Sequence, residues 1–401
     1  MEHAEQLINL AKINSEGDKR GCCEKMNDPV HPARQIPFPD LIAGLKRAQG
    51  LGHVHRRPNA TNTLQLYIYT PRCVYEDGWD QFSLIARGLI VDEGAGRVVA
   101  TPFPKFFNVG ERHGEVPDLP FEAFEKLDGS LIIVFNDAGR WHAATKGAFD
   151  SEQALWAQAR LDAHDLSGLS PDTTYLFEAV YPENRIVVRY AEPAMVMLAA
   201  YHASGLEVTY DEVRTTSQAL GWRAAERHEF GNMADMMLHT ATLPRDNEGF
   251  VVRFTTGLRL KLKGSEYRRI HALISRCTPL AMWEAMAAGD DMAAIRRDLP
   301  EEFWSDFDNI VLLLTKEYAA MERKVAELAA SVAHLSDKEL GLSLNSLPAD
   351  VGPYVFGLRK AGAIVGKSRD ALMRSIRPTG NVLPGYQPSY AMGRVIDEAT
   401  S

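Results

Sequence analysis

The segment Lys126-Leu127-Asp128-Gly129-Ser130 is the part of the sequence best suited to covalent chemistry, because a lysine amine can attack phosphorus. The amine must be uncharged to do so, and with an ordinary pKa of about 10.4 only about one in 2,500 is uncharged at pH 7. Nearby cations or burial would have to lower the pKa of Lys126. Alone, Asp-Gly is more typical of a hairpin turn, so a catalytic interpretation requires further basic groups nearby.

Such groups occur elsewhere in the chain. Lys261 and Lys263, in the strand pattern LRLKLKGSEY, are two residues apart and therefore point to the same face. Two adjacent ammonium groups repel each other unless a polyphosphate lies across them. Arg87, Lys105 and Lys146 also lie in or beside strand patterns. An exposed stripe of cations is the alternative interpretation of each.

Two carboxylates accompany these cations. Glu178 lies inside the apolar strand pattern TYLFEAVY, where an unpaired acid is costly to bury, and Glu248 precedes the strand pattern GFVVRF. A structural salt bridge would explain either acid. Near a triphosphate, a carboxylate is also a ligand for Mg²⁺. No GxxxxGK[ST] or GxGxxG segment occurs, so a phosphate site here is not a P-loop.

The elements that must hold these residues change along the chain. From Leu64 to about Arg268 the pattern predicts a mainly antiparallel sheet, with helices near 151–162, 210–220 and 233–238. Beyond it, apolar residues recur with the helical period, which predicts a helical domain. They are Phe303, Trp304, Phe307, Ile310, Val311, Leu314, Tyr318, Met321, Val325, Leu328 and Val332. Residues 1–36 are expected to form a loosely attached extension with a short helix at 4–11.

Length and composition limit the possible classes of protein. The 401 residues suffice for two or three domains, and a net charge of −9 argues against a wholly basic nucleic-acid-binding surface. Basic residues concentrate in 251–276 and 359–377, which fits a polyanion held at a defined place. With no run of eighteen apolar residues, no secretory signal pattern and no CxxC pair among four cysteines, a cytoplasmic protein is expected.

The order of the motifs resembles a known family. The blocks are ARGLIV (86–91), PFPKFFNVGE (102–111), KLDGSL (126–131), TKGAFDSEQAL (145–155), LFEAVYPENRIV (176–187), EGFVV (248–252) and KLKGSEY (261–267). Together they resemble the covalent nucleotidyltransferases, and within them the ATP-dependent RNA ligases typified by the bacteriophage enzyme that repairs cleaved tRNA. The likeness covers about residues 64–270.

The resemblance implies an α+β fold. It consists of a mainly antiparallel-sheet nucleotidyltransferase domain (ATP-grasp-like ligase) over 37–270, followed by an all-α RNA-binding domain over 271–401. It implies AMP bound covalently to Lys126 and a metal at Glu248. The residues expected to bind ATP or its phosphates are Arg87, Lys105, Phe107, Gly129, Lys146, Glu178, Lys261 and Lys263, with Asp128 and Tyr267 supporting the site.

The implied activity is the joining of an RNA 5′-phosphate to a 3′-hydroxyl, with ATP and Mg²⁺ or Mn²⁺. The RNA partner would be cleaved tRNA or single-stranded RNA ends, gripped by the helical domain. The basic residues expected to contact it are Arg359, Lys360, Lys367 and Arg369. Separate kinase and phosphatase proteins would prepare the RNA ends, and a monomer is expected.

Four alternatives remain open at this stage. DNA ligases and capping guanylyltransferases use the same lysine, but normally place an OB-fold barrel where helices are expected here. A fungal-type tRNA ligase core that requires a 2′-phosphate is excluded by no single residue. A non-catalytic RNA or adenylate binder would usually lose the lysines that this chain retains.

Overall fold

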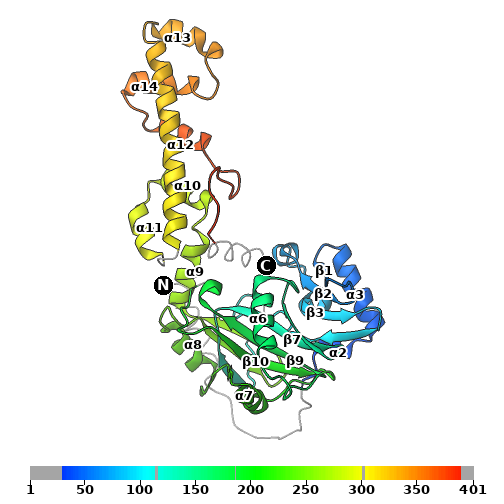
Figure 1. The fold of residues 1–401 in the computed structure, drawn as a ribbon. Helices are drawn as coiled ribbons and strands as arrows, with labels where there is room; N and C mark the ends of the chain where they lie inside the picture. Colours follow the sequence, from blue (N-terminus) through cyan, green and yellow to red (C-terminus); the bar gives the residue numbers. More distant parts are fainter. Residues whose placement is uncertain (1–28, 113–115, 186, 300–302, 390–401) are drawn as a thin grey trace. The chain divides into compact units, whose positions relative to one another are not determined.

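The computed structural model describes residues 29–112, 116–185, 187–299 and 303–389 (Figure 1). The chain divides into two compact units after Arg268. The helix predicted at 4–11, and most of the predicted extension 1–36, lie outside the described residues. The end of that extension is not loosely attached: the buried His31 ring hydrogen-bonds to the Pro102 carbonyl at 2.8 Å, just before α2 (Pro32–Gln35).

The first sheet of unit 1 is antiparallel, with the order β1-β2-β3-β4. Alternate residues of its central strands face two separate cores: Leu66 and Ile90 pack toward the second sheet, whereas Tyr67 and Leu89 pack under helices. This two-sided burial explains their nearly continuous apolar sequence. The elements are α3 (Phe38–Gly50), β1 (Val54–Pro58), β2 (Gln65–Tyr69), α4 (Pro71–Tyr75), α5 (Gln81–Ile85), β3 (Arg87–Asp92) and β4 (Arg97–Ala100).

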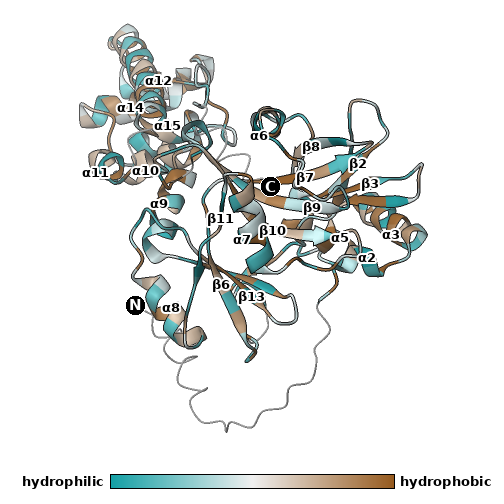
Figure 2. Ribbon diagram, turned by 60° about the horizontal axis from the view of Figure 1, so that its bottom comes forward, coloured by the Kyte–Doolittle hydropathy of each residue, from teal (hydrophilic) through white to brown (hydrophobic). Residues whose placement is uncertain are grey.

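The second sheet has the order β11-β10-β9-β7-β8 and is antiparallel except between β10 and β11. Ile133 faces the first sheet and Ile132 faces a separate helix-covered core. Strands β7 and β10 are hydrophobic over most of their length (Figure 2). The elements are β7 (Ser130–Asp137), β8 (Arg140–Thr145), α6 (Glu152–Asp162), β9 (Thr173–Val180), η1 (Pro182–Asn184), β10 (Ala194–His202), α7 (Tyr210–Ala219) and β11 (Arg223–Ala224).

The third sheet has the order β12-β6-β13-β14-β5, with only β14 and β5 parallel. Its elements are β5 (Phe107–Asn108), β6 (Phe121–Glu125), β12 (Arg227–His228), α8 (Met233–Ala241), β13 (Gly249–Phe254) and β14 (Arg259–Lys263). The residues between β6 and β7 connect two different sheets, so the Asp128-Gly129 hairpin turn considered above does not form. The predicted antiparallel-rich sheets and the helices near 151–162, 210–220 and 233–238 are confirmed.

Unit 2 is helical, as predicted. Its longest helix buries Phe307, Ile310, Leu314 and Val325 on one face, which the 3.6-residue period had indicated. The elements are α9 (Ser265–Ser275), which crosses the unit boundary, α10 (Pro279–Ala288), α11 (Met292–Asp298), α12 (Trp304–Ser331), α13 (Asp337–Ser343), η3 (Leu344–Ser346), α14 (Gly352–Ala361) and α15 (Lys367–Ser375). None of the helices in the described ranges is long and apolar enough to cross a membrane. The fold class is α+β, as expected.

Candidate active site

The side chain of Lys126 contacts Glu248, and Lys263 contacts the same carboxylate. Lys126 stands between β6 and β7, and its Nζ lies 2.6 Å from Oε2 of Glu248, the residue before β13. The other oxygen of Glu248, Oε1, lies 3.2 Å from Nζ of Lys263 at the end of β14. The Glu248 side chain is only 2% exposed. The fold thus brings together three predicted site residues that lie far apart in the sequence.

The backbone fixes the position of Lys126 relative to Glu248. The Lys126 N–H donates to the Gly249 carbonyl oxygen at 2.9 Å. Gly249 has φ +140°, and a Cβ there would overlap the carbonyl oxygen of Leu262 in β14. Only glycine lets β13 approach β14 this closely at that point. The sequence analysis did not single out Gly249, although it directly follows the predicted acid.

The charge state of Lys126 differs from the one predicted. Burial lowers the pKa of Lys126, but the negative charges of Glu248, Glu178 and Asp128 outweigh burial, so the pKa is raised above its ordinary value. The prediction that surrounding cations hold this amine uncharged is therefore wrong for the protein by itself. The reason is distance, because Glu248 makes a direct hydrogen bond to the amine.

Lys261 is the amine whose pKa is strongly lowered. Burial is the largest cause, followed by the positive charges of Lys126, Arg87 and Lys105. Nζ of Lys261 and Cζ of Arg87 lie 4.9 and 5.4 Å from the centroid of the Phe106 ring. Nη1 of Arg87 is buried without a hydrogen-bond partner in the described part of the chain. Crowded cations with an unused donor favour the binding of an anion such as a phosphate.

Lys105 is surrounded by aromatic rings. Its Nζ lies 5.2 Å from the ring centroid of Tyr69 and 5.3 Å from those of Trp79 and Phe107. Burial lowers the pKa of Lys105. The rings stabilise its charge without occupying its hydrogen-bond donors. Sequence analysis predicted Lys105 and Phe107 but missed Tyr69 and Trp79, because these come from β2 and from the connection between α4 and α5.

Glu178 and Gly129 lie against each other beside the Lys126 segment. A Cβ at Gly129 would overlap the carbonyl oxygen of Ala179 and lie 3.1 Å from Cγ of Glu178 in β9, so the turn after Lys126 requires a glycine. Lys146 directly follows β8, and its Cα would lie 2.8 Å from a Cβ added to Gly88. The predicted residues Lys146 and Arg87 are therefore on adjacent backbone segments.

Asp128 supports the Lys126 segment. Its Oδ2 accepts hydrogen bonds from the N–H groups of Val187 and Val188 at 2.7 and 2.8 Å, and its Oδ1 accepts one from the Tyr267 hydroxyl at 2.9 Å. The Asp128 N–H donates to the Tyr190 hydroxyl at 2.7 Å. Burial raises the pKa of Asp128. The N–H groups of residues 187 and 188 therefore pair with the Asp128 side chain.

The basic residues predicted to bind RNA divide into two kinds. The Arg359 guanidinium donates to the carbonyl oxygens of Val332 and Leu335 at 2.8 and 2.9 Å. The Arg369 guanidinium likewise donates to the carbonyl oxygens of Met286 and Ala287, at 2.9 and 3.2 Å near the end of α10. The remaining two, Lys360 and Lys367, are exposed. The two arginines thus already bind backbone carbonyls within unit 2.

The comparisons with known proteins agree with the motifs. A family model described as RNA ligase matches residues 85–267. A putative bifunctional polynucleotide kinase/RNA ligase of Autographa californica nuclear polyhedrosis virus is 28% identical over 242 residues, covering 52% of this chain and 34% of that protein. An RNA ligase of Rhodothermus phage RM378 is 25% identical over 184 residues, covering 35% of this chain and 42% of the relative. The chain therefore spans less than half of the length of these two relatives.

Among solved structures, an archaeal ATP-dependent RNA ligase is similar over 70% of this chain and 83% of its own, with 16% identity and a TM-score of 0.48. The sequence matches show that residues 85–267 are similar to RNA ligases of the nucleotidyltransferase type. This region is therefore similar to the ATP-dependent RNA ligases of the phage type, in agreement with the resemblance given by the motifs.

Proposed function

We propose that this chain joins RNA ends with ATP, using Lys126 as the residue that carries AMP. The observation that carries the proposal is the buried contact of Lys126 with Glu248, next to the cations Lys263, Lys261 and Arg87. An amine that contacts one acid, with further cations close by, suits a reaction in which a phosphate is first attached to the protein and then passed on.

In the first step, the uncharged Lys126 amine attacks the α-phosphorus of ATP. A nitrogen–phosphorus bond forms, the bond from the α-phosphorus to the bridging oxygen breaks, and pyrophosphate leaves. The Lys126 ammonium would lose one proton before the attack and a second as the nitrogen–phosphorus bond forms, and both would pass to solvent along a side chain that is 18% exposed. Lys261 and Lys263 would stabilise the charge that develops on the phosphate oxygens.

In the second step, an oxygen of the RNA 5′-phosphate attacks the same phosphorus, the nitrogen–phosphorus bond breaks, and the nitrogen takes up a proton from solvent as the Lys126 amine is released. In the third, the 3′-hydroxyl of the other RNA end attacks the activated 5′-phosphate, a phosphodiester forms, AMP leaves and the hydroxyl proton is lost. Glu178 would bind the ribose of the nucleotide. Arg87, Lys105 and Lys146 would contact phosphates of ATP or RNA, and Phe107 would lie near the nucleotide.

Mg²⁺, or Mn²⁺ in its place, fits the carboxylates of this site. The described residues contain no group of three His, Cys, Asp or Glu side chains suited to hold a metal by themselves. Mg²⁺ is commonly held by one or two carboxylates together with substrate phosphates, which suits the buried Glu248 with Glu178 nearby. When bound, the ion would offset the carboxylate charge that raises the pKa of Lys126.

The RNA substrate is proposed to be a cleaved tRNA or a pair of single-stranded ends, with end-preparing enzymes separate and the chain monomeric. Of the four predicted contacts in unit 2, Lys360 and Lys367 have exposed side chains free to meet phosphates. Ligation of nicked tRNAs, linear strands and nicked duplexes, each with and without a 2′-phosphate at the junction, separates this proposal from a fungal-type ligase.

Incubation with α-labelled ATP and Mg²⁺ tests the lysine assignment. We expect an acid-sensitive label that survives denaturation and maps to the peptide containing Lys126. Lys126→Ala should abolish the label, whereas Lys324→Ala, at an exposed position of α12, should retain it. A label on Lys261, the amine with the lowered pKa, would overturn the assignment of Lys126. No label on the wild-type protein would overturn the proposed activity.

A further inference from the structure

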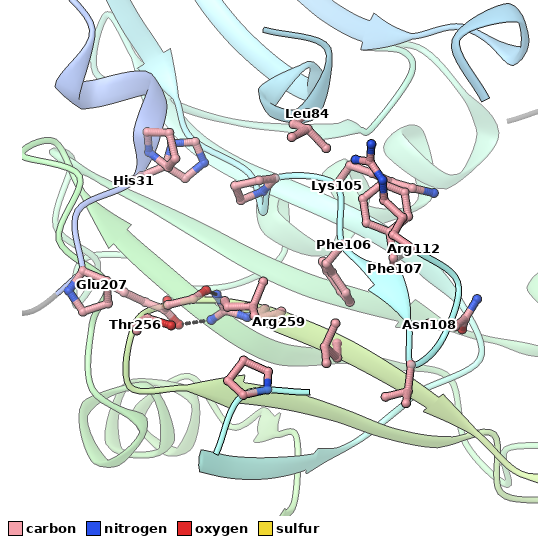
Figure 3. A pocket seen from close by; sticks show the side chains of 18 of the residues that line it. His31, Leu84, Lys105, Phe106, Phe107, Asn108, Arg112, Glu207, Thr256 and Arg259 are labelled. Atoms are coloured by element: carbon pink, nitrogen blue, oxygen red, sulfur yellow. Dashed lines mark hydrogen bonds and ion pairs between the residues drawn. The ribbon is translucent and has the colours of Figure 1, made fainter. Parts of the chain in front are cut away.

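Unit 1 contains a cavity of about 560 Å³ to which the proposed mechanism assigns no part of the substrate, although Lys105 and Phe107 line it (Figure 3). Residues 29–32, the segment around 104–112, and the β13–β14 turn at 256–260 contribute most of its lining. Its size is typical of a small-molecule site. Figure 3 shows Lys105, Arg112 and Phe107 together on one side and Glu207, Thr256 and Arg259 on the other, with Phe106 between them.

The polar groups on the Arg259 side of the cavity are already paired. Arg259 forms an ion pair with Glu207, and both side chains are almost fully buried. The Tyr201 hydroxyl lies 3.3 Å from Nη1 of Arg259. Burial lowers the pKa of His31 to about 3, so its ring is neutral. This side therefore has no free charge to offer a ligand.

The opposite side is positively charged. Arg112 Cζ and Lys105 Nζ lie 4.9 and 5.3 Å from the centroid of the Phe107 ring. In the described parts of the chain, Arg112 has only a 3.7 Å contact with the exposed carboxylate of Asp77, and Lys105 has no ion pair. A ligand that suits this cavity has an anionic group at one end and an apolar, flat body.

Phe106 separates this cavity from the catalytic cations. The ring lines the cavity, yet it also lies within 5.4 Å of Arg87 Cζ and 4.9 Å of Lys261 Nζ, neither of which lines the cavity. Lys105 likewise belongs to both places, since it lines the cavity and its charge helps to lower the pKa of Lys261. The cavity therefore begins where the proposed phosphate site ends.

The proposed second step indicates which part of the RNA would lie in the cavity. In an adenylated RNA end, the donor 5′-phosphate is attached to AMP where ATP carries its β-phosphate. The first nucleotide of the donor strand consequently extends away from AMP, beyond the cations that would hold the outer phosphates of ATP. A nucleotide also has the required form, with a phosphate at one end and a flat base that stacks on aromatic rings.

We infer that this cavity binds the 5′-terminal nucleotide of the RNA strand that receives AMP. Its phosphate faces Lys105 and Arg112, and its base lies against Phe106 and the apolar wall that includes Leu258. This inference rests on the proposed function and adds a place for the donor strand to the same site. If it is correct, a side chain that fills the cavity should slow the transfer of AMP to the RNA end. The same side chain should leave lysine adenylation by ATP unchanged.

Leu258→Trp is the main test, because Leu258 lines the cavity and is 45% exposed, so a larger side chain can be accommodated without disturbing a core. The matched control is Leu238→Trp, at a position of α8 that is 62% exposed and does not line the cavity. Two rates are measured in each variant: lysine adenylation by ATP, and transfer of AMP from the preloaded protein to a nucleoside 3′,5′-bisphosphate. A third measurement compares two inhibitors of adenylation. One is ADP, and the other is a 5′,5′-linked dinucleotide, which is ADP with a second nucleoside joined through its 5′-oxygen to the β-phosphate.

We expect the dinucleotide to bind the wild type and Leu238→Trp about tenfold more tightly than ADP. Leu258→Trp should lose that difference and transfer AMP about tenfold more slowly, with adenylation by ATP unchanged. Thr256→Trp, on the same turn, should act in the same direction. The inference is overturned if Leu258→Trp matches the control in transfer and inhibition, or if it loses adenylation by ATP, since the cavity would then belong to the ATP site. Absence of adenylation in the wild type would instead overturn the proposed function.

Discussion

The two units use their basic residues in opposite ways. In unit 1, Lys261, Arg87 and Lys105 are crowded near the Lys126 segment, and none of them forms an ion pair with a described acid. In unit 2, Arg359 and Arg369 donate to backbone carbonyls at the ends of helices. Both regions are rich in cations in the sequence, but the arginines of the second are occupied by carbonyls, which leaves Lys360 and Lys367 as its exposed cations.

The comparison shows that the number of cations in a segment is weaker evidence of function than the groups that they already bind. A guanidinium bound to carbonyls stabilises a fold, because those carbonyls would otherwise remain unsatisfied at the helix end. A buried guanidinium with an unused N–H, such as that of Arg87, is costly unless an anion meets it. The same residue type therefore has different consequences when it is removed.

The largest expected effect is on the chemical step. Lys261→Ala should slow lysine adenylation about 100-fold at saturating ATP, because it removes the donor proposed to stabilise the reacting phosphate. Lys324→Ala should leave this rate unchanged, because Lys324 is an exposed residue of α12 and belongs to unit 2. Initial rates of label incorporation measure both. Equal rates in the two variants would mean that the cation crowding in unit 1 has no catalytic role.

A smaller effect is expected on the stability of unit 2. Arg359→Ala should lower the free energy of local unfolding by about 2 kcal/mol, because two carbonyls and Asp337 lose a charged donor. Lys360→Ala, at the next position and exposed, should change it by less than about 0.5 kcal/mol. Hydrogen exchange of the α13 and α14 amides gives the comparison. Similar exchange in both variants would show that the Arg359 contacts contribute nothing measurable.

The smallest effect concerns pH. The pKa of His31 is about 3 in the folded protein and about 6.5 when unfolded, so acid protonates the unfolded chain first and stability falls as the pH drops below about 6.5. His31 alone should make the free energy of unfolding about 1.4 kcal/mol lower at pH 5.5 than at pH 8. His31→Gln should remove this contribution, whereas His334→Gln, at an exposed position of unit 2, should leave the pH dependence unchanged. Denaturant unfolding at both pH values measures it, and an unaltered slope in His31→Gln would contradict the buried neutral ring.

Sequence was sufficient where residue type and spacing determine the outcome. The period of the apolar residues predicted α12, and the alternation of the strands predicted the antiparallel sheets. The motif order predicted that Lys126, Glu248 and Lys263 would lie together, and the fold places them in direct contact. These features depend on local pattern or on residues that the chemistry itself requires.

Sequence was insufficient where the outcome depends on distance between remote segments. The pKa of Lys126 is set by whether an acid or a cation lies closer, and no spacing in the sequence gives that order. Tyr69 and Trp79 reach Lys105 only through the packing of β2 and the α4–α5 connection. The pairing of Asp128 with the amides of Val187 and Val188 likewise joins residues that are 59 and 60 positions apart.

The absence of a Cβ at Gly249 limits how Lys126 can move relative to Glu248. Because Gly249 lets its strand lie directly against β14 while its carbonyl oxygen accepts a hydrogen bond from the Lys126 N–H, Lys126 and Glu248 are held by hydrogen-bonded segments of the same backbone. Any movement of the protein during a catalytic cycle must carry the two together. Substrates would then have to move into contact with Lys126 and Glu248, which keep their positions relative to each other.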